Sequence, residues 1–237
     1  MLRATLVISM SLFGLCLGQA SYAATLTNPY RLATSADPRA IVTGDLNGDG
    51  VQDFVWTSSN AEGSEFNVYL SQPGGGWLPG TSFAFPANST VSSCTLADVN
   101  GDKNLDLVCS VSSESNAYAD VFLGHGDGTF QSPIVTVVPL PLTGTYAETV
   151  LAAEGDLNGD GLPDFFFEDR ASSSGYMLLS DGKGGFKPPL PVSSGINNVL
   201  PFAADVNGDG IPDLLYPEGP EVCVSLTTTF CTACNNC

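Results

Sequence analysis

Acidic and amide side chains recur at fixed alternate positions of a nine-residue segment in this 237-residue chain. The segment occurs four times, starting at Asp45, Asp98, Asp156 and Asp205. Positions 1, 3, 5 and 9 always carry Asp, Asn, Asp and Asp, whereas positions 2, 7 and 8 vary. A hard dication such as calcium takes about six to eight oxygen ligands, and a short loop with ligands at alternate positions can wrap such an ion. The pattern therefore predicts four calcium-binding loops.

Each loop is expected to hold one ion through its four polar side chains and the carbonyl of position 7, which gives about four ions in all. Lys103 replaces the glycine that stands at position 6 of the other three loops. Because lysine lacks the freedom of glycine at positive φ and adds a positive charge, the loop at Asp98 is expected to be the weakest site. The expected ligands are Asp45, Asn47, Asp49, Val51 and Asp53; Asp98, Asn100, Asp102, Asn104 and Asp106; Asp156, Asn158, Asp160, Leu162 and Asp164; and Asp205, Asn207, Asp209, Ile211 and Asp213.

Two other interpretations of the loops compete with calcium binding by this pattern. Asn, Asp and Gly are common in tight turns without any metal, but a turn does not require the terminal Asp that all four copies share. An EF-hand requires a Glu at position 12, where this chain has Trp56, Cys109, Phe167 and Tyr216. The residues that follow each loop form short apolar runs, which predict buried strands rather than helices.

The elements that must position the loops also repeat, since the loop starts are 53, 58 and 49 residues apart. Each loop is followed by one strand and then by a second, at 66–70, 119–123, 176–179 and 222–226. Proline-containing segments at 132–136 and 188–192 are expected to be outer edge strands. Four strands per unit are typical of a propeller blade. We therefore expect an all-β fold, a β-propeller of about four blades over residues 24–230, with repeats near 37–86, 90–140, 147–193 and 197–230.

A loop of the form Asp-x-Asn-x-Asp-Gly-x-x-Asp is followed by Val-Phe-Leu-Gly-x-Gly-Asp-Gly-Thr-Phe, best seen from Val121 to Phe130. In this combination the chain resembles the FG-GAP or VCBS repeat family, and the resemblance covers nearly all of residues 28–230. It implies calcium-binding propeller blades that serve in adhesion, in carbohydrate binding or beside an enzyme. The resemblance leads us to expect about seven blades, whereas we count four. A closed four-bladed ring and an open or partial array both remain possible.

Several features predict that the protein is secreted, into the extracellular space or the periplasm. Residues 1–23 carry Arg3, an apolar run over 6–18 and a small-x-small end at Ala23, as in a secretory signal peptide. No other apolar stretch is long enough to span a bilayer. The net charge of −18 argues against nucleic acid and anionic membranes as partners. An extracellular carbohydrate or protein is the expected partner, and the oligomeric state is not set by the sequence.

Six cysteines would remain after removal of the signal peptide, an even number that fits an oxidising compartment. Cys94 and Cys109 flank the second loop, where a hairpin would bring them together, so we expect a disulfide between them. The other four are Cys223, Cys231, Cys234 and Cys237, three of them in a cysteine-rich tail at 231–237. Disulfides are expected there too, with a zinc or iron–sulfur cluster as the alternative.

Residues suited to catalysis are few. His125 is the only histidine and lies in a glycine-rich turn at 124–128, which predicts a turn residue rather than a general base. Glu168 and Asp169, beside Arg170, are the only paired carboxylates outside the loops, and we expect a solvated strand end there rather than an acid–base pair.

Three aromatic residues have two possible roles: Trp77, Tyr118 and Tyr176 could stack on sugar rings or fill the space between blades. The sequence as a whole predicts a secreted calcium-binding module for adhesion or binding. The alternatives are a polysaccharide-active, lyase-like enzyme module and a structural partner that another chain completes.

Overall fold

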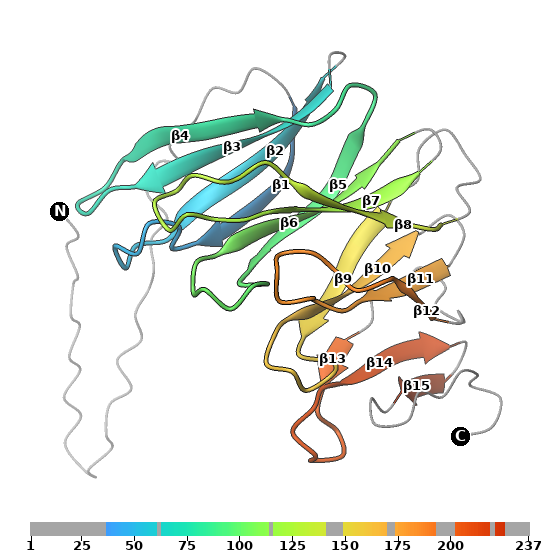
Figure 1. Cartoon of the computed structure of the whole chain (residues 1–237). Helices are drawn as coiled ribbons and strands as arrows, with labels where there is room; N and C mark the ends of the chain where they lie inside the picture. The colour runs from blue at the N-terminus through green and yellow to red at the C-terminus, as the bar shows by residue number, and fades with distance from the viewer. Residues whose placement is uncertain are drawn as a thin grey trace, which may run out of the picture. The chain divides into compact units, whose positions relative to one another are not determined.

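The computed structural model describes residues 37–60, 63–113, 116–140, 149–169, 174–192, 202–218 and 221–225 (Figure 1). The chain divides into two units, Met1–Thr34 and Ser35–Cys237, and every described residue belongs to the second. The expected signal peptide, Arg170 and the cysteine-rich tail lie outside the described residues.

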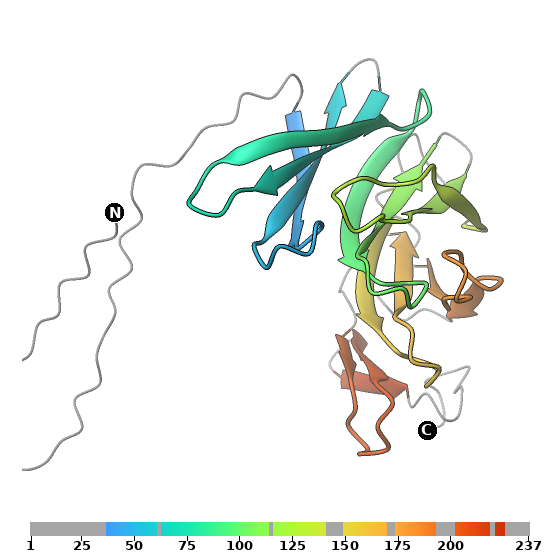
Figure 2. The ribbon, with the colours of Figure 1, turned by 60° about the vertical axis from the view of Figure 1, so that its left-hand side comes forward.

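The described strands form four antiparallel sheets in which neighbouring strands follow each other in the chain (Figures 1 and 2). Sheet 1 contains β1 (Asp37–Gly44), β2 (Asp53–Asn60), β3 (Gly63–Ser71) and β4 (Trp77–Ala84). Sheet 2 contains β5 (Thr90–Ala97), β6 (Asp106–Ser112), β7 (Ala117–Phe122) and β8 (Ile134–Val138). Sheet 3 contains β9 (Thr149–Gly155), β10 (Asp164–Asp169), β11 (Ser174–Leu178) and β12 (Leu190–Val192). Sheet 4 contains β13 (Phe202–Ala204), β14 (Asp213–Glu218) and β15 (Glu221–Ser225).

The predicted all-β architecture of four-stranded antiparallel sheets, as in propeller blades, is confirmed for sheets 1 to 3. Sheet 4 has three strands in the part of the chain that the structure describes. The edge strands expected at 132–136 and 188–192 correspond to β8 and β12, the outermost strands of sheets 2 and 3. β8 itself contains no proline, because it begins after Pro133. Pro191 of β12 lies opposite Tyr176 of β11, and an edge strand tolerates proline because one side of it is unpaired.

The strand that follows each loop alternates its apolar residues between two neighbouring sheets. Its first and third residues after the loop's last aspartate face the preceding sheet, and the second faces the following sheet, because side chains alternate along a strand. Leu107 and Cys109 of β6 pack with Val55 of sheet 1; Phe165 and Phe167 of β10 pack with Val108 of sheet 2; Leu214 of β14 packs with Phe166 of sheet 3. The core therefore lies between successive sheets.

The first strands of the sheets contact each other in chain order, β1 with β5, β5 with β9 and β9 with β13. They take the place of the inner strands of propeller blades. Closure of the four sheets into a ring stays a prediction.

Candidate metal sites

The four acidic loops occupy the same place in each sheet, the hairpin between its first and second strands (Figure 1). Consecutive loops are neighbours in space. Leu162 of the third loop lies beside Gly101 of the second, and Ile211 of the fourth lies beside Gly159 of the third. Leu105, near the end of the second loop, lies beside Gly44, which precedes the first. The loops thus line up along one end of the successive sheets.

The first loop is closed by hydrogen bonds from backbone N–H groups to its own side chains. Asp45 Oδ1 accepts from Gly48 N at 2.8 Å and from Asp49 N at 3.1 Å, and its Oδ2 accepts from Gly50 N at 2.8 Å. Asn47 Oδ1 accepts from Asp49 N at 3.0 Å, and Asp49 Oδ1 accepts from Val51 N at 2.8 Å. The bond from Gly50 is the main cause that lowers the pKa of Asp45. The loop is therefore preorganised around an Asp45 carboxyl group whose ionised form is favoured.

The other three loops repeat this arrangement, which explains why positions 1, 3 and 5 do not vary. The bond from position 6 to Oδ2 of position 1 measures 2.8 Å at Asp98, 2.7 Å at Asp156 and 2.9 Å at Asp205. Lys103 makes this bond with a φ of 74°, in the left-handed region that Gly50 occupies with a φ of 80°. The second loop thus keeps the geometry of the others with a residue that is strained there.

The aspartate at position 9 ties its loop to the sheet. Asp53 is fully buried, and its Oδ2 accepts from Leu46 N at 2.9 Å while its Oδ1 accepts from Ser71 N, at the end of β3, at 2.7 Å. Asp106 and Asp164 make the same two kinds of bond, to Val99 and Gly124 and to Leu157 and Ser180. Burial raises the pKa of both Asp106 and Asp164 to about 6. We call the position-9 aspartates the brace aspartates, since those of sheets 1 to 3 join the loop to the end of the third strand of the sheet. Asp213 accepts the bond from its own loop, donated by Val206 N.

The donor chemistry of the loops fits calcium, because every expected ligand is an oxygen and the aspartates at positions 1 and 5 lie at the surface. A carboxylate oxygen that accepts one N–H still has a lone pair for a cation. Within the described residues, no three His, Cys, Asp or Glu side chains come together in a group that could hold a metal ion. In this structure the loop side chains turn toward backbone N–H groups instead, so the assignment of the loop residues as ligands stays a prediction.

The third loop pairs with a cationic side chain from outside the loop, which the sequence did not indicate. Lys187 Nζ lies 3.1 Å from Asp160 Oδ2 and donates a hydrogen bond to it. Lys187 is 27 residues further along the chain, so no local motif could have indicated this pair. A calcium ion in that loop would compete with the ammonium group for Asp160.

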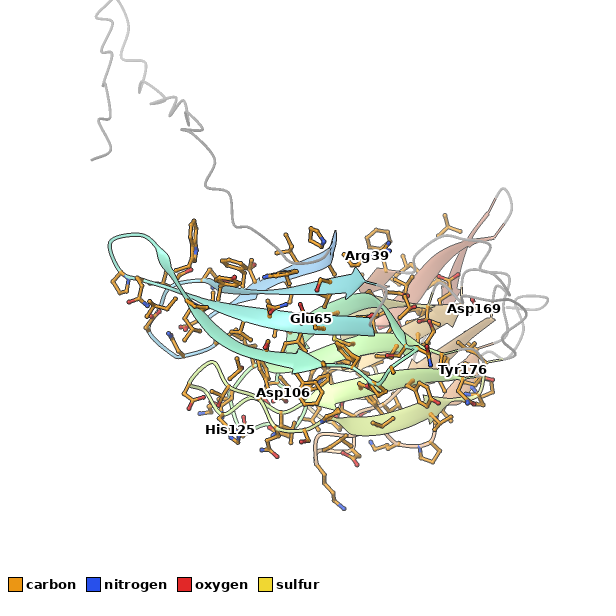
Figure 3. The ribbon with its side chains drawn as sticks, turned by 90° about the horizontal axis from the view of Figure 1, so that it is seen from above. Arg39, Glu65, Asp106, His125, Asp169 and Tyr176 are labelled. Atoms are coloured by element: carbon orange, nitrogen blue, oxygen red, sulfur yellow. A yellow bond between two sulfur atoms is a disulfide. The ribbon has the colours of Figure 1, made fainter. Side chains whose placement is uncertain are left out.

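The other candidate residues of sheet 2 include a pair of cysteines and a histidine. The predicted disulfide is confirmed, since Cys94 and Cys109 lie opposite each other on β5 and β6 and are bonded. Disulfides persist in oxidising compartments, which is consistent with an extracellular location. His125 is exposed at the margin of the ribbon, whereas Asp106 is buried (Figure 3).

The expectation of a solvated strand end at Glu168 and Asp169 is wrong, because both side chains are buried. The reason is that β10 is a central strand, and its pairing with β9 and β11 continues to Asp169. The apolar run ends where the sequence indicates, but its cover comes from strands that are distant in the sequence.

Two of the three candidate aromatic residues fill space between sheets, and the third does not. Tyr118 and Tyr176 pack against the cores between sheets, and Tyr176 Oη donates a hydrogen bond to the Pro139 carbonyl at 2.8 Å. Trp77 belongs instead to a half-buried aromatic cluster on sheet 1. Phe54 stacks on Tyr69 with ring centroids 5.1 Å apart, and Trp77 meets Phe54 edge-on at 6.0 Å.

The part of the chain that the structure describes contains no helix that is long and apolar enough to cross a membrane.

Comparison with known proteins identifies one family and one related fold. The FG-GAP-like repeat matches residues 45–109 and 156–216, more than half of the chain. Thirteen chains of solved structures match. One is an Agrocybe aegerita lectin, described in terms of specific recognition of non-reducing terminal N-acetylglucosamine, with 19% identity and a TM-score of 0.53. The match covers 83% of this chain and 51% of the lectin, so this chain spans about half the length of that protein. A search of curated proteins found no match.

Proposed function

The chain belongs to the FG-GAP-like repeat family, and on this basis we propose that it is a secreted calcium-binding repeat protein that acts as a binding module for an extracellular carbohydrate. The observation that carries the calcium part is the fourfold recurrence of one oxygen-rich loop at one end of four successive sheets. Members of this family commonly bind calcium in such loops.

The role of calcium in this proposal is structural. A bound dication would neutralise carboxylates that otherwise repel each other in a chain with a net charge of −18. The chain's own residues do the rest. The position-1 and position-5 aspartates hold the hairpin closed, and the brace aspartates of sheets 1 to 3 connect it to the third strand of the sheet. Binding energy would therefore add to folding stability, because the unfolded chain does not present the preorganised loop.

The carbohydrate part of the proposal is supported by the lectin of similar fold, which specifically recognises non-reducing terminal N-acetylglucosamine. The acidic composition disfavours nucleic acid and anionic membranes, and it leaves neutral sugars as compatible ligands. We place no sugar at a particular residue.

The calcium part is tested by calorimetric titration together with thermal unfolding in calcium and in chelator. We expect about four ions per chain and a large loss of stability in chelator. Asp45→Ala should remove one ion. Asp127→Ala is the matched control, because Asp127 is an exposed aspartate in the turn between β7 and β8, outside all four loops. Absence of calcium binding by the folded protein would mean that the loops are turns only.

The carbohydrate part is tested separately on a glycan array with calcium-loaded, folded protein. We expect binding to glycans that end in N-acetylglucosamine, with galactose-terminated glycans as the comparison. If the folded, calcium-loaded protein binds no glycan on the array, the carbohydrate part is wrong and the calcium part still stands.

A further inference from the structure

Sheet 4 presents an apolar face at register positions that are buried in every other sheet. Leu215 of β14 lies opposite Val224 of β15, as Val55 lies opposite Val68, Val108 opposite Val121 and Phe166 opposite Met177. The exposed fractions are 1% for Val68, 0% for Val121 and 6% for Met177, against 40% for Val224. At the next position facing the same way they are 1% for Phe66 and 0% for Ala119, against 69% for Val222. The difference arises because sheets 1 to 3 each have a following sheet to pack against.

Phe202 of β13 completes this apolar face. It lies opposite Leu215 and is 73% exposed. We call Phe202, Leu215, Val222 and Val224 the trailing face of the molecule. In the part of the chain that the structure describes, no sheet follows sheet 4 and covers this face.

Sheet 1 presents the complementary surface at the end of β2 that carries Phe54. Further along the same side the surface is covered, since Trp56 is 6% and Ser58 0% exposed. Phe54 is the first residue after Asp53. The residues at the equivalent position of sheets 2, 3 and 4 are Leu107, Phe165 and Leu214, and each of them faces the preceding sheet. Tyr69 lies opposite Phe54, and Ile41, on the same side of the sheet, is 67% exposed. Trp77 completes the surface through its contact with Phe54. We call Ile41, Phe54, Tyr69 and Trp77 the leading face.

We propose that the trailing face of one copy of this chain packs on the leading face of a second copy, so that two copies associate head to tail. The contact would continue the packing that already joins sheets 1 to 2, 2 to 3 and 3 to 4, in which a trailing surface always meets a leading one. A second copy is the occupant that matches both faces at once, because each copy carries one of each kind.

Symmetry and blade number agree with such a pair. A head-to-tail contact produces a closed assembly when the rotation closes, and an open fibre when it does not. Two copies, each with the four sheets that the structure describes, make eight, which lies within the range of about four to eight blades known for propellers. The lectin of similar fold has about twice the length that this chain matches, so one chain of that protein has room for roughly twice the repeats. The pairing is independent of any sugar or calcium ion.

The experiment is light scattering after size-exclusion chromatography, over a series of concentrations of the purified protein. We expect a species with twice the mass of one chain that dissociates on dilution. Val222→Asp on the trailing face and Ile41→Asp on the leading face should each raise the dissociation constant at least about tenfold. Val137→Asp on β8 is the matched control, because Val137 is 53% exposed and belongs to neither face.

A mixing experiment tests the head-to-tail geometry itself. The Val222→Asp copy keeps an intact leading face and the Ile41→Asp copy keeps an intact trailing face. In a mixed pair one contact joins two intact faces, whereas both contacts of either variant alone include an altered face. Because an aspartate buried in an apolar contact breaks that contact, an equimolar mixture should associate more tightly than either variant alone. If two trailing faces met each other instead, Ile41→Asp would have no effect and mixing would restore nothing, and either result would overturn the proposal.

Two further outcomes would also overturn it. One is a wild-type protein that stays a monomer at every concentration. That outcome counts against the proposal also where a glycan or a segment of the same chain occupies the two faces. The other is equal association of Val222→Asp and Val137→Asp. All variants are first compared with the wild type by thermal unfolding. Should Val222→Asp fail to fold, Phe202→Ser alters the same face with a smaller change.

Discussion

Asp120 is the residue whose titration should be easiest to separate from that of the loops. It lies on β7 opposite Cys109, on the side of sheet 2 that packs against sheet 1, and its side chain is 3% exposed. Its Oδ1 accepts no hydrogen bond from the described residues. Burial raises the pKa of Asp120 from 3.8 to about 6. The fold therefore favours the protonated carboxyl group over the ionised one.

The sign of the pH dependence follows from this shift. The folded-state pKa is higher than the unfolded value, so the stabilisation is fully present below about pH 4 and is lost as the pH rises through about 6. A shift of about two units corresponds to at most about 3 kcal/mol. We expect about 1–3 kcal/mol in practice, since partial hydration and relaxation reduce the penalty of the charge.

Asp120→Asn removes the ionisable group and nearly preserves its shape. At about pH 7 the free energy of unfolding of the variant should exceed that of the wild type by about 1–3 kcal/mol. At about pH 4 the two free energies of unfolding should be equal. The matched control is Asp127→Asn, whose exposed carboxylate is bonded to Thr129 and should give no gain at either pH.

Urea unfolding at the two pH values, in chelator so that calcium does not contribute, measures these differences. Other acidic groups titrate in the same range, but they do so in both proteins and cancel in the comparison. An equal difference between Asp120→Asn and the wild type at both pH values would refute the reasoning, because the carboxyl group would then not change its charge as a buried acid.

Three further changes address the loops and the hairpin that carries the second one. Asp164→Ala should lower the free energy of unfolding by about 3–5 kcal/mol in chelator, since two buried backbone N–H groups lose their acceptor, whereas Asp160→Ala at the surface should lower it by less than about 1 kcal/mol. Urea unfolding compares the two variants, and similar losses would contradict the role of the brace aspartate. Lys103→Gly should tighten calcium binding by its loop about fivefold by calorimetry, because it removes backbone strain and a positive charge; an unchanged affinity would contradict the role assigned to Lys103. Replacing Cys94 and Cys109 by Ser should lower the unfolding free energy by about 2–3 kcal/mol, for a loop with a sequence separation of 15, and an unchanged melting temperature would count against that cross-link.

The fold was readable from the sequence to the extent that local patterns determine it. Each second strand begins at the loop's last aspartate, at Asp53, Asp106, Asp164 and Asp213, where the apolar run was expected. The turn between β5 and β6 brings Cys94 and Cys109 opposite each other, so their disulfide was predictable from their spacing in the sequence. Regular strand pairing between consecutive segments of the chain needs no long-range information.

Features that depend on contacts between distant segments could not be predicted. The ion pair between Lys187 and Asp160 joins two turns that are 27 residues apart. The burial of Glu168 and Asp169 depends on the strands that lie on both sides of β10. The sequence marked the position-9 aspartates as metal ligands, and only the structure reveals that Asp53 accepts a bond from Ser71, 18 residues away.

The brace aspartates also connect the loop to the packing of the sheets. Each one is the first residue of its strand and points back to its own loop, so the next residue must point to the opposite side of the sheet. That residue is Phe54, Leu107, Phe165 or Leu214, and in sheets 2 to 4 it faces the preceding sheet. A shift of one residue after the aspartate would turn every side chain of the strand to the wrong neighbour. The oxygen pattern of the loop and the apolar pattern of the strand are therefore held in one register, and the same register leaves a leading face on sheet 1 and a trailing face on sheet 4.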